Sequence, residues 1–396
     1  MDFFLIAYTI ILLVVLLIVF IELVSRRILF ANTPFIQKIF GHPMIKYSLR
    51  RIGSALISVL LAVIATFFLI RAAVDIDQLC NTRMFGGTSF KYPDYVVAAR
   101  CAVFRKEMGF EGNAFQQLGT FLYAILPFPK LLCSSYFQTI DGVTYMYGEN
   151  CRAFIMDLGQ IFTTQITGSQ SPVYVIDFIF ERMAVSFPVM MAAVVVQLLL
   201  GYPLGIAMAK NKDGVVDHLG NAYIVTVEAI PGVAYYYIWM ALFVGLMGLP
   251  ERYDSSVFLS WIPPVLTVGL AGLTGIAFWV RRHMIDQFSS DYVKFARAKG
   301  LSETRITATH IFRNAIVPLA RTFPGAVLGS LMGSFFIERI YRISGIGNLL
   351  VDANTHNEIF ALQGIVIISA LISVFAYLLG DIATAIADPR VRFMKE

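Results

Sequence analysis

Two charged residues lie inside long apolar stretches of this 396-residue chain, Glu228 and Arg321. Ionisable side chains within a bilayer are costly and usually have a function. Their opposite charge and similar depth would let them pair as an intramembrane gate near the inner surface. In the alternative, each side chain reaches the membrane interface by itself, as a long arginine readily does.

Four cysteines gather in one segment between two apolar stretches, and none has CxxC spacing. This argues against a zinc or thioredoxin-like site. We expect disulfides in an oxidising compartment, although buried free thiols remain an alternative. Four cysteines allow three pairings, and the sequence does not choose among them. The candidates are Cys80, Cys101, Cys133 and Cys151.

The charged stretch 291–318 separates two apolar stretches. Residues 291–299 predict a short amphipathic helix with Ser290 or Asp291 as its N-cap. Gly300 suits the left-handed turn that ends such a helix.

Tyr292, Phe295 and Ala296 are expected to share one face of this short helix. A helix parallel to the membrane can insert a bulky apolar side chain into a groove of a cytosolic partner. The alternative is an interfacial helix that rests on the lipid surface.

The sequence lacks patterns of common enzyme sites. There is no GxxxxGK[ST] phosphate-binding loop, so ATP hydrolysis on this chain is not expected. No serine or cysteine triad is recognisable, and no basic stripe with interleaved aromatic residues indicates nucleic-acid binding. The five histidines are scattered without metal-ligand spacing: His42, His218, His283, His310 and His356.

The elements that carry these residues are predicted to be membrane helices. Hydrophobic residues make up 58% of the chain and charged residues 14%, which indicates an integral membrane protein. A spanning helix needs about 20 mostly apolar residues. Seven stretches qualify: 3–24, 52–72, 183–209, 220–248, 259–280, 315–337 and 361–386.

Lysine and arginine predict the orientation of these spans. Residues 25–51 contain six basic residues and no acidic one, and the loop after residue 280 and the C-terminal tail are also basic. Basic loops remain on the cytoplasmic side, so we expect the N-terminus outside and the C-terminus inside. The cysteine-bearing segment 73–176 is then extracytoplasmic and long enough to fold as a small domain.

Several motifs together resemble one transporter family. DYVKFARAKGL and HIFRNAIVP, with Ala296, Gly300, Asn314 and Pro318, are similar to the cytoplasmic signature of binding-protein-dependent ABC importer permeases, peptide/nickel branch. MIKYSLRRIGSALISVL, EAIPGVAYYYIWMALF and IERIYRISGIGNLLVDA resemble the B-type subunit of oligopeptide/dipeptide permeases. The resemblance covers about 44–72 and 156–394, and leaves 1–43 and most of 73–155 unmatched.

The resemblance implies an all-α polytopic fold with a six-helix type I permease core. To this we add an extra N-terminal span and an inserted extracytoplasmic domain. The expected parts are 1–43 (extra helix and linker), 44–72 (first core helix), 73–176 (external domain), 177–390 (five-helix core with coupling loop 281–314) and 391–396 (tail).

The resemblance also implies the partners. These are a second homologous permease, two cytoplasmic ABC ATPases, an extracytoplasmic substrate-binding protein and membrane lipid. No cofactor is expected on this chain, and ATP and magnesium would bind the ATPases. By the same resemblance, the ATPase-coupling residues are Asp291, Tyr292, Phe295, Ala296, Arg297, Ala298, Gly300 and Leu301.

The expected function is therefore peptide import across a bacterial cytoplasmic membrane by alternating access. Alternatives are import of nickel or another small solute, and an ion-coupled secondary transporter with Glu228 as its proton site. A membrane scaffold or receptor that acts through its external domain is a further alternative.

Overall fold

The computed structural model describes most of the chain from residue 43 onward. The predicted span 3–24 and the C-terminal tail lie outside the described residues. The described ranges are 43–85, 91–107, 109–126, 130–140, 143–154, 156–161, 163–168 and 173–387.

The chain divides into two compact units. The first comprises the described part of Met1–Phe180 together with Asp352–Leu371, and the second comprises Glu181–Val351 together with the described residues from Ile372 onward. The two long helices α8 (Val175–Lys210) and α19 (Ile359–Ala387) contribute residues to both units.

The first unit begins with helix α3. Near the end of this helix, Arg71 contacts the turn between the third and fourth helices of the unit. Arg71 donates to the Gly109 carbonyl at 3.0 Å, and its guanidinium lies 3.4 Å from the centroid of the Phe110 ring. Such a cation–π contact adds to the hydrogen bond. The helices of this part are α3 (Pro43–Ala73), α4 (Ile76–Phe85), α5 (Asp94–Glu107) and α6 (Ala114–Ile125).

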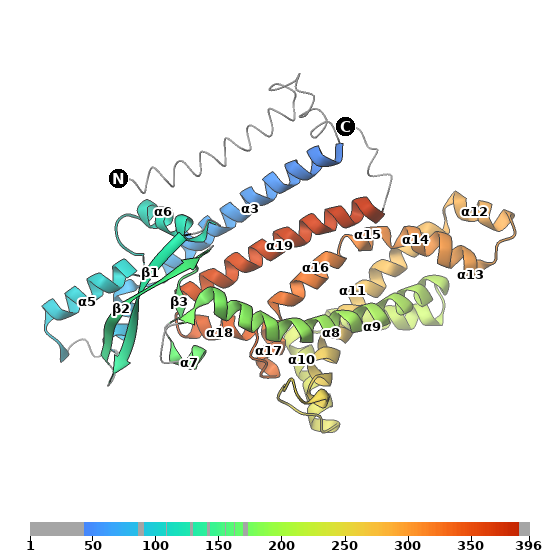
Figure 1. Cartoon of the computed structure of the whole chain (residues 1–396). Helices are drawn as coiled ribbons and strands as arrows, with labels where there is room; N and C mark the ends of the chain where they lie inside the picture. The colour runs from blue at the N-terminus through green and yellow to red at the C-terminus, as the bar shows by residue number, and fades with distance from the viewer. Residues whose placement is uncertain are drawn as a thin grey trace, which may run out of the picture. The chain divides into compact units, whose positions relative to one another are not determined.

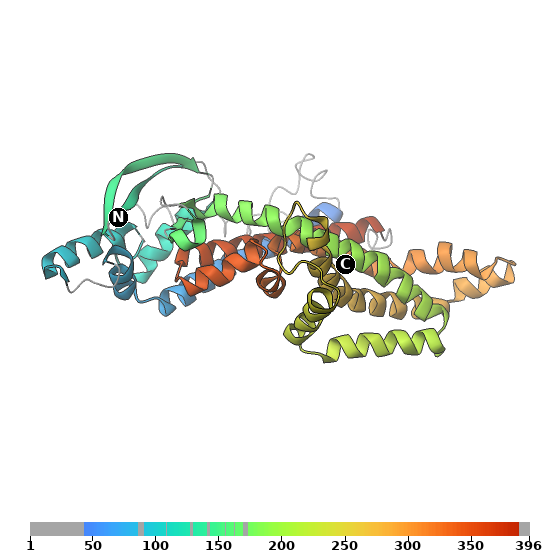
Figure 2. The ribbon, with the colours of Figure 1, turned by 90° about the horizontal axis from the view of Figure 1, so that it is seen from below.

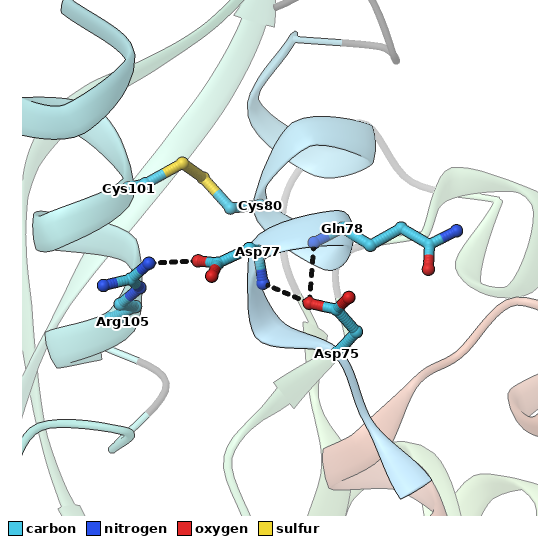
Figure 3. The surroundings of a disulfide bond; sticks show 6 residues. All are labelled: Asp75, Asp77, Gln78, Cys80, Cys101 and Arg105. Carbon is cyan, nitrogen blue, oxygen red and sulfur yellow. Dashed lines mark hydrogen bonds and ion pairs between the residues drawn. A yellow bond between two sulfur atoms is a disulfide. The ribbon is translucent and has the colours of Figure 1, made fainter. Parts of the chain in front are cut away.

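A disulfide between Cys80 and Cys101 joins α4 to α5, with the two Cα atoms 5.8 Å apart (Figure 3). Arg105 and Asp77 form an ion pair between the same two helices. Asp75 caps α4 by accepting hydrogen bonds from the backbone of Asp77 and Gln78. The expectation of a disulfide is thus confirmed for one of the three pairings that the sequence allowed.

A long β-hairpin follows α6. Strands β1 (Lys130–Ile140) and β2 (Val143–Phe154) are antiparallel, and their register places Cys133 directly opposite Cys151. The remaining short elements of this unit are β3 (Gln160–Ile161), α7 (Thr164–Thr167) and β4 (Val173–Tyr174). β3 pairs with β4, and the Thr163 backbone donates to the buried Glu358 carboxylate at 2.7 Å.

The second unit is built on close packing of α8 against α11 (Ile262–Phe288). Glycines on both helices permit the approach. A Cβ atom at Gly205 would lie 2.7 Å from the Ala277 carbonyl, and one at Gly269 would lie 2.6 Å from a Val196 methyl group. A side chain at either glycine would therefore force α8 and α11 apart or displace its neighbour, because protein interiors are close-packed.

The chain bends by 106° between helices α9 (Val215–Ala229) and α10 (Gly232–Met240). The bend can be followed in Figure 2. Pro231 lies at the break and has no backbone N–H to continue the first helix. A π-helical stretch (Ala241–Leu246) extends α10. Together α9 and α10 have the length and composition of one broken membrane span.

From α12 to α18 the second unit consists of short helices (Figure 1). Prolines and glycines break the predicted span 315–337 into several short helices. The elements are α12 (Asp291–Ala298), α13 (Glu303–Arg305), a π-helical stretch (Ile306–Ile311), α14 (Phe312–Ala315), α15 (Val317–Ala320), α16 (Phe323–Gly329), α17 (Phe335–Ile340) and α18 (Ile346–Thr355), the last of which continues into the first unit.

The described residues contain three helices that are long and apolar enough to cross a membrane. These lie in 175–210, 258–288 and 359–381, and the bent pair α9–α10 makes a fourth. The predicted span 52–72 falls within α3, whose apolar part Leu56–Ala72 is shorter. A helical membrane protein is confirmed, whereas the number of seven spans stays a prediction.

Candidate functional site

The 291–299 stretch forms the predicted short helix, α12, at the end of α11 (Figure 2). Ser290 has the extended backbone of an N-cap residue, although its side chain makes no cap hydrogen bond. Gly300 adopts φ +75°, as predicted. The N–H of Leu301 bonds to the Ala296 carbonyl and that of Gly300 to the Arg297 carbonyl, which closes a Schellman-type end.

The faces of α12 differ from the prediction in one respect. Val293 and Ala296 are buried, whereas Phe295 is 69% exposed. Helical spacing places Tyr292, Phe295 and Ala296 on one side of α12, but the apolar core contacts Tyr292 and Ala296 and leaves Phe295 exposed. The Phe295 ring projects away from the buried stripe of Val293 and Ala296.

A continuous apolar core fixes α12 to the long helices. Val293 and Ala296 pack with Met284 of α11 and with Ile306 and Ile311 of the following segment, all in one buried cluster. Burial of a side chain of this size stabilises by roughly 1.5–3 kcal/mol. Helices α12 and α11 therefore share one buried core.

The surface around α12 combines charged side chains with an open cavity of about 810 Å³. Arg297 bridges to Glu303 through two hydrogen bonds of 2.7 and 3.2 Å, and Lys294 bonds to Asp291 at 2.8 Å. Asp291, Arg297 and Ala298 are exposed, and Leu301 packs against the core. The cavity is lined by residues from three segments, namely Ala209, Lys210, Lys212, Ile285, Asp286, Phe288, Ser289, Arg297, Glu303, Thr304 and Thr307.

An almost inaccessible ion pair joins the start of α9 to α11 near this surface. Arg281 donates to both carboxylate oxygens of Asp217, at 2.5 and 2.7 Å. The Asp217 side chain is 3% exposed and also accepts from the Asp213 backbone and the Asn221 amide. We call these residues the Asp217 clasp. The sequence reading missed the clasp, although an aspartate in the first turn of an apolar helix could have indicated it.

The predicted pair between Glu228 and Arg321 is not formed. Glu228 accepts a hydrogen bond from the Thr274 hydroxyl at 2.9 Å, and Arg321 contacts Asp381 at 3.4 Å. Both residues lie in apolar stretches as expected, but the broken helices around them give each another partner. The predicted intramembrane gate required Glu228 and Arg321 to pair, and in this structure they do not.

A second buried carboxylate, also missed from the sequence, organises the loop between α17 and α18. Glu338 is fully buried and accepts from the Ser186 hydroxyl at 2.7 Å and from the Ser334 and Asn348 backbones at 3.3 and 3.0 Å. Ser186 accepts in turn from the Ile346 backbone at 2.9 Å. Burial raises the pKa of Glu338 although these donors act in the opposite direction.

A Cβ atom on either Gly333 or Gly345 would collide with the Glu338 carboxylate. Gly333 and Gly345 thus make room for this group. We call Glu338, Ser186 and the backbone donors the Glu338 network.

The described residues combine long apolar helices with a short helix at the end of α11. Residues 201–393 match the family of binding-protein-dependent transport system inner membrane components.

Among curated proteins, the chain is similar to permeases for peptides. It is 38% identical over 200 residues to the oligopeptide transport system permease protein AmiC of Streptococcus pneumoniae. It is 28% identical over 350 residues to the dipeptide transport system permease protein DppB of Lactococcus lactis subsp. cremoris, across 88% of this chain and all of that one. The predicted resemblance to the peptide branch is confirmed.

The extent of these matches differs. The AmiC match covers 50% of this chain and 40% of AmiC, so the chain spans less than half the length of that relative. A solved chain of the methionine ABC transporter MetNI, in an inward-facing conformation, aligns with 54% of this chain and 97% of its own at 13% identity, with a TM-score of 0.41.

Proposed function

We propose that the chain is the transmembrane permease subunit of an ATP-driven importer that translocates oligopeptides or dipeptides by alternating access. Support comes from the family match over 201–393 and from relatives whose names specify oligopeptide and dipeptide transport. These names favour peptides over nickel or another small solute, and over an ion-coupled secondary transporter that uses Glu228.

The observation that carries the proposal is the exposed Phe295 on a rigidly anchored helix. An exposed aromatic ring on a helix with a buried opposite face is suited to a groove of a partner protein. In the proposed assembly, two cytoplasmic ABC ATPases bind α12 and its flanking residues. Closure of the ATPases, with ATP and magnesium bound to them, moves α12 and thereby α11.

The assembly further includes a second homologous permease and an extracytoplasmic binding protein that delivers the peptide. In this proposal the protein spans a bacterial inner membrane with its N-terminus outside and its C-terminus in the cytoplasm. Segment 73–176 is the extracytoplasmic domain inserted between core helix 44–72 and the five-helix core 177–390. The Cys80–Cys101 disulfide supports this side, because disulfides persist in oxidising compartments.

The test is purification of the chain from its native membrane in mild detergent, with identification of the copurifying subunits and an ATPase assay. We expect a second permease and P-loop ATPases, and we expect Phe295→Asp to release the ATPases. Phe115→Asp is the matched control, because Phe115 on α6 is exposed to the same extent, at 68%, and lies outside the helices that could cross a membrane.

Retention of the ATPases by Phe295→Asp, or their equal loss from both variants, would contradict the role of α12. Recovery of the chain alone, with peptide uptake driven by an ion gradient, would contradict the importer as a whole.

A further inference from the structure

Glu228 lies at the break of the bent span α9–α10. It is the penultimate residue of α9, two residues before the extended backbone of Ile230. Its side chain is exposed on this chain. Non-helical backbone at membrane depth occurs only where it is buried in protein or lines a water-filled cavity. This break therefore has the properties of a position along a transport path.

The carboxylate of Glu228 has no cation to balance it among the described residues. Its hydrogen-bond partner there is the neutral Thr274 hydroxyl, at 2.9 Å. The basic residue expected to pair with it, Arg321, contacts Asp381 instead. Thr274 is buried on α11, and its one hydroxyl proton is shared between the Ala271 carbonyl at 2.8 Å and the Glu228 carboxylate at 2.9 Å, so that one carboxylate oxygen lies beside this hydroxyl.

Two further features make this position negative. The carbonyl end of a helix carries a partial negative charge, and Glu228 lies in the last turn of α9. Pro231 offers no N–H, and the chain turns by 106°, so α9 cannot continue and satisfy the carbonyls of its last turn. A helix end and a carboxylate thus direct negative potential to the same point, which favours a cation.

The available ligands favour an ammonium group over a metal ion. Metal sites in proteins are held by several side chains, and the described residues contain no group of three His, Cys, Asp or Glu that could bind one. One carboxylate oxygen beside the Thr274 hydroxyl and a second oxygen that is open suit a single ammonium group with three N–H donors.

We propose that Glu228, positioned by Thr274 at the end of α9, binds the α-ammonium group of the peptide cargo during its passage. This inference rests on the proposed function, since peptides supply the ammonium group. A free N-terminus is present whatever the peptide's sequence. A contact at this group therefore holds many different peptides in one orientation, without reading their side chains.

The experiment uses the assembled importer in lipid nanodiscs without the binding protein, so that selection by the binding protein does not contribute. A photoreactive peptide with a free N-terminus is compared with its N-acetylated form, and labelling of this chain is quantified. Wild type should prefer the free amine by roughly tenfold, a typical effect for one charge-assisted hydrogen bond. Glu228→Gln should abolish this preference by lowering labelling with the free-amine peptide alone.

Two control variants accompany it. Glu228→Asp keeps the charge and should retain most of the preference. Glu251→Gln removes an exposed carboxylate that pairs with Arg342 and should leave the preference at the wild-type value. An unchanged preference in Glu228→Gln, or an equal loss of labelling by both peptides, would overturn the ammonium site. A crosslink from position 228 to a basic residue of the second permease would also overturn it.

ATP-driven uptake of the free-amine peptide is measured on the complete assembly with its binding protein. Absence of uptake in wild type would contradict the proposed function itself. Uptake in wild type together with an unchanged amine preference in Glu228→Gln would contradict the ammonium site alone.

Discussion

The Asp217 clasp and the Glu338 network are two buried carboxylates of the second unit, and only the first faces a cation. Asp217 meets the guanidinium of Arg281 with both oxygens, whereas Glu338 is held by a serine hydroxyl and backbone N–H groups. The arginines near Glu338 bond to other oxygens, with Arg182 donating to the Ser344 carbonyl and Arg339 to the Asn348 side chain.

The difference shows two ways to fix a chain segment. A bidentate ion pair joins two helices, α9 and α11, and both partners remain charged over a wide pH range. Neutral donors around a carboxylate organise a loop, but its charge is less well compensated and the group can gain a proton. We therefore expect the Glu338 network to respond to pH in a range where the Asp217 clasp does not.

The largest effect should come from breaking the clasp. Asp217→Asn leaves the Arg281 guanidinium, which is 21% exposed, without its counter-charge. Removal of one partner of a buried pair costs about 3 kcal/mol. We expect a clear fall in melting temperature of the purified protein. Adding Arg281→Gln should restore part of the loss, and a double-mutant cycle measures the interaction. A fall no larger than that of an exposed pair would contradict the clasp.

The next largest effect should come from Glu338→Gln. Glutamine has one acceptor oxygen, so its amide group must face either the Asn348 N–H or the Ser186 and Ser334 donors. A buried donor left without an acceptor costs about 1–3 kcal/mol. Melting temperature again measures the loss, with Glu251→Gln as the exposed control. Equal stability of the two variants would show that the Glu338 network does not hold the loop.

The two carboxylates should also differ in pH dependence. The pKa of Glu338 is raised above its ordinary 4.5 in the folded protein. At a pH between the ordinary pKa and the raised pKa, Glu338 is protonated in the folded state and ionised in the unfolded state. The free energy of unfolding should therefore fall as the pH rises through this interval. Melting curves of wild type and Glu338→Gln over the acidic range should diverge accordingly. Parallel curves would mean that Glu338 does not titrate in the folded protein.

The smallest effect is expected for the exposed pair between Arg297 and Glu303. Both side chains are about half exposed or more, at 46% and 62%, and solvent screens such pairs strongly. Glu303→Gln should leave the melting temperature within experimental error. A large decrease would mean that exposure does not explain the difference between the clasp and other ion pairs of this chain.

The local features near α12 followed from the sequence because they depend on neighbouring residues. The length of α12 and the left-handed Gly300 were correctly predicted from capping and glycine rules. The burial of Ala296 next to an exposed Phe295 was not predicted, because it depends on Met284, Ile306 and Ile311 packing against Val293 and Ala296. Helical spacing shows which residues are neighbours, but not which side meets the core.

The buried carboxylates could not be paired from the sequence, because their partners are distant along the chain. Asp217 and Arg281 are 64 residues apart, and Ser186 and Glu338 are 152 apart. Glu228 and Arg321 show the same problem in reverse. Their similar depth made pairing reasonable, but the breaks at Pro231 and within 315–337 redirect both side chains.

The continuity of α11 has a mechanical consequence. Its 27 residues form a rod about 40 Å long, at 1.5 Å per residue, with α12 attached to one end. A tilt of about 10° about one end of such a rod displaces the other end by roughly 7 Å, from the same helix geometry. The α8–α11 glycine contacts stiffen this rod against bending. A small rotation imposed on α12 is thereby converted into a displacement larger than the diameter of a methyl group at the far end of the rod.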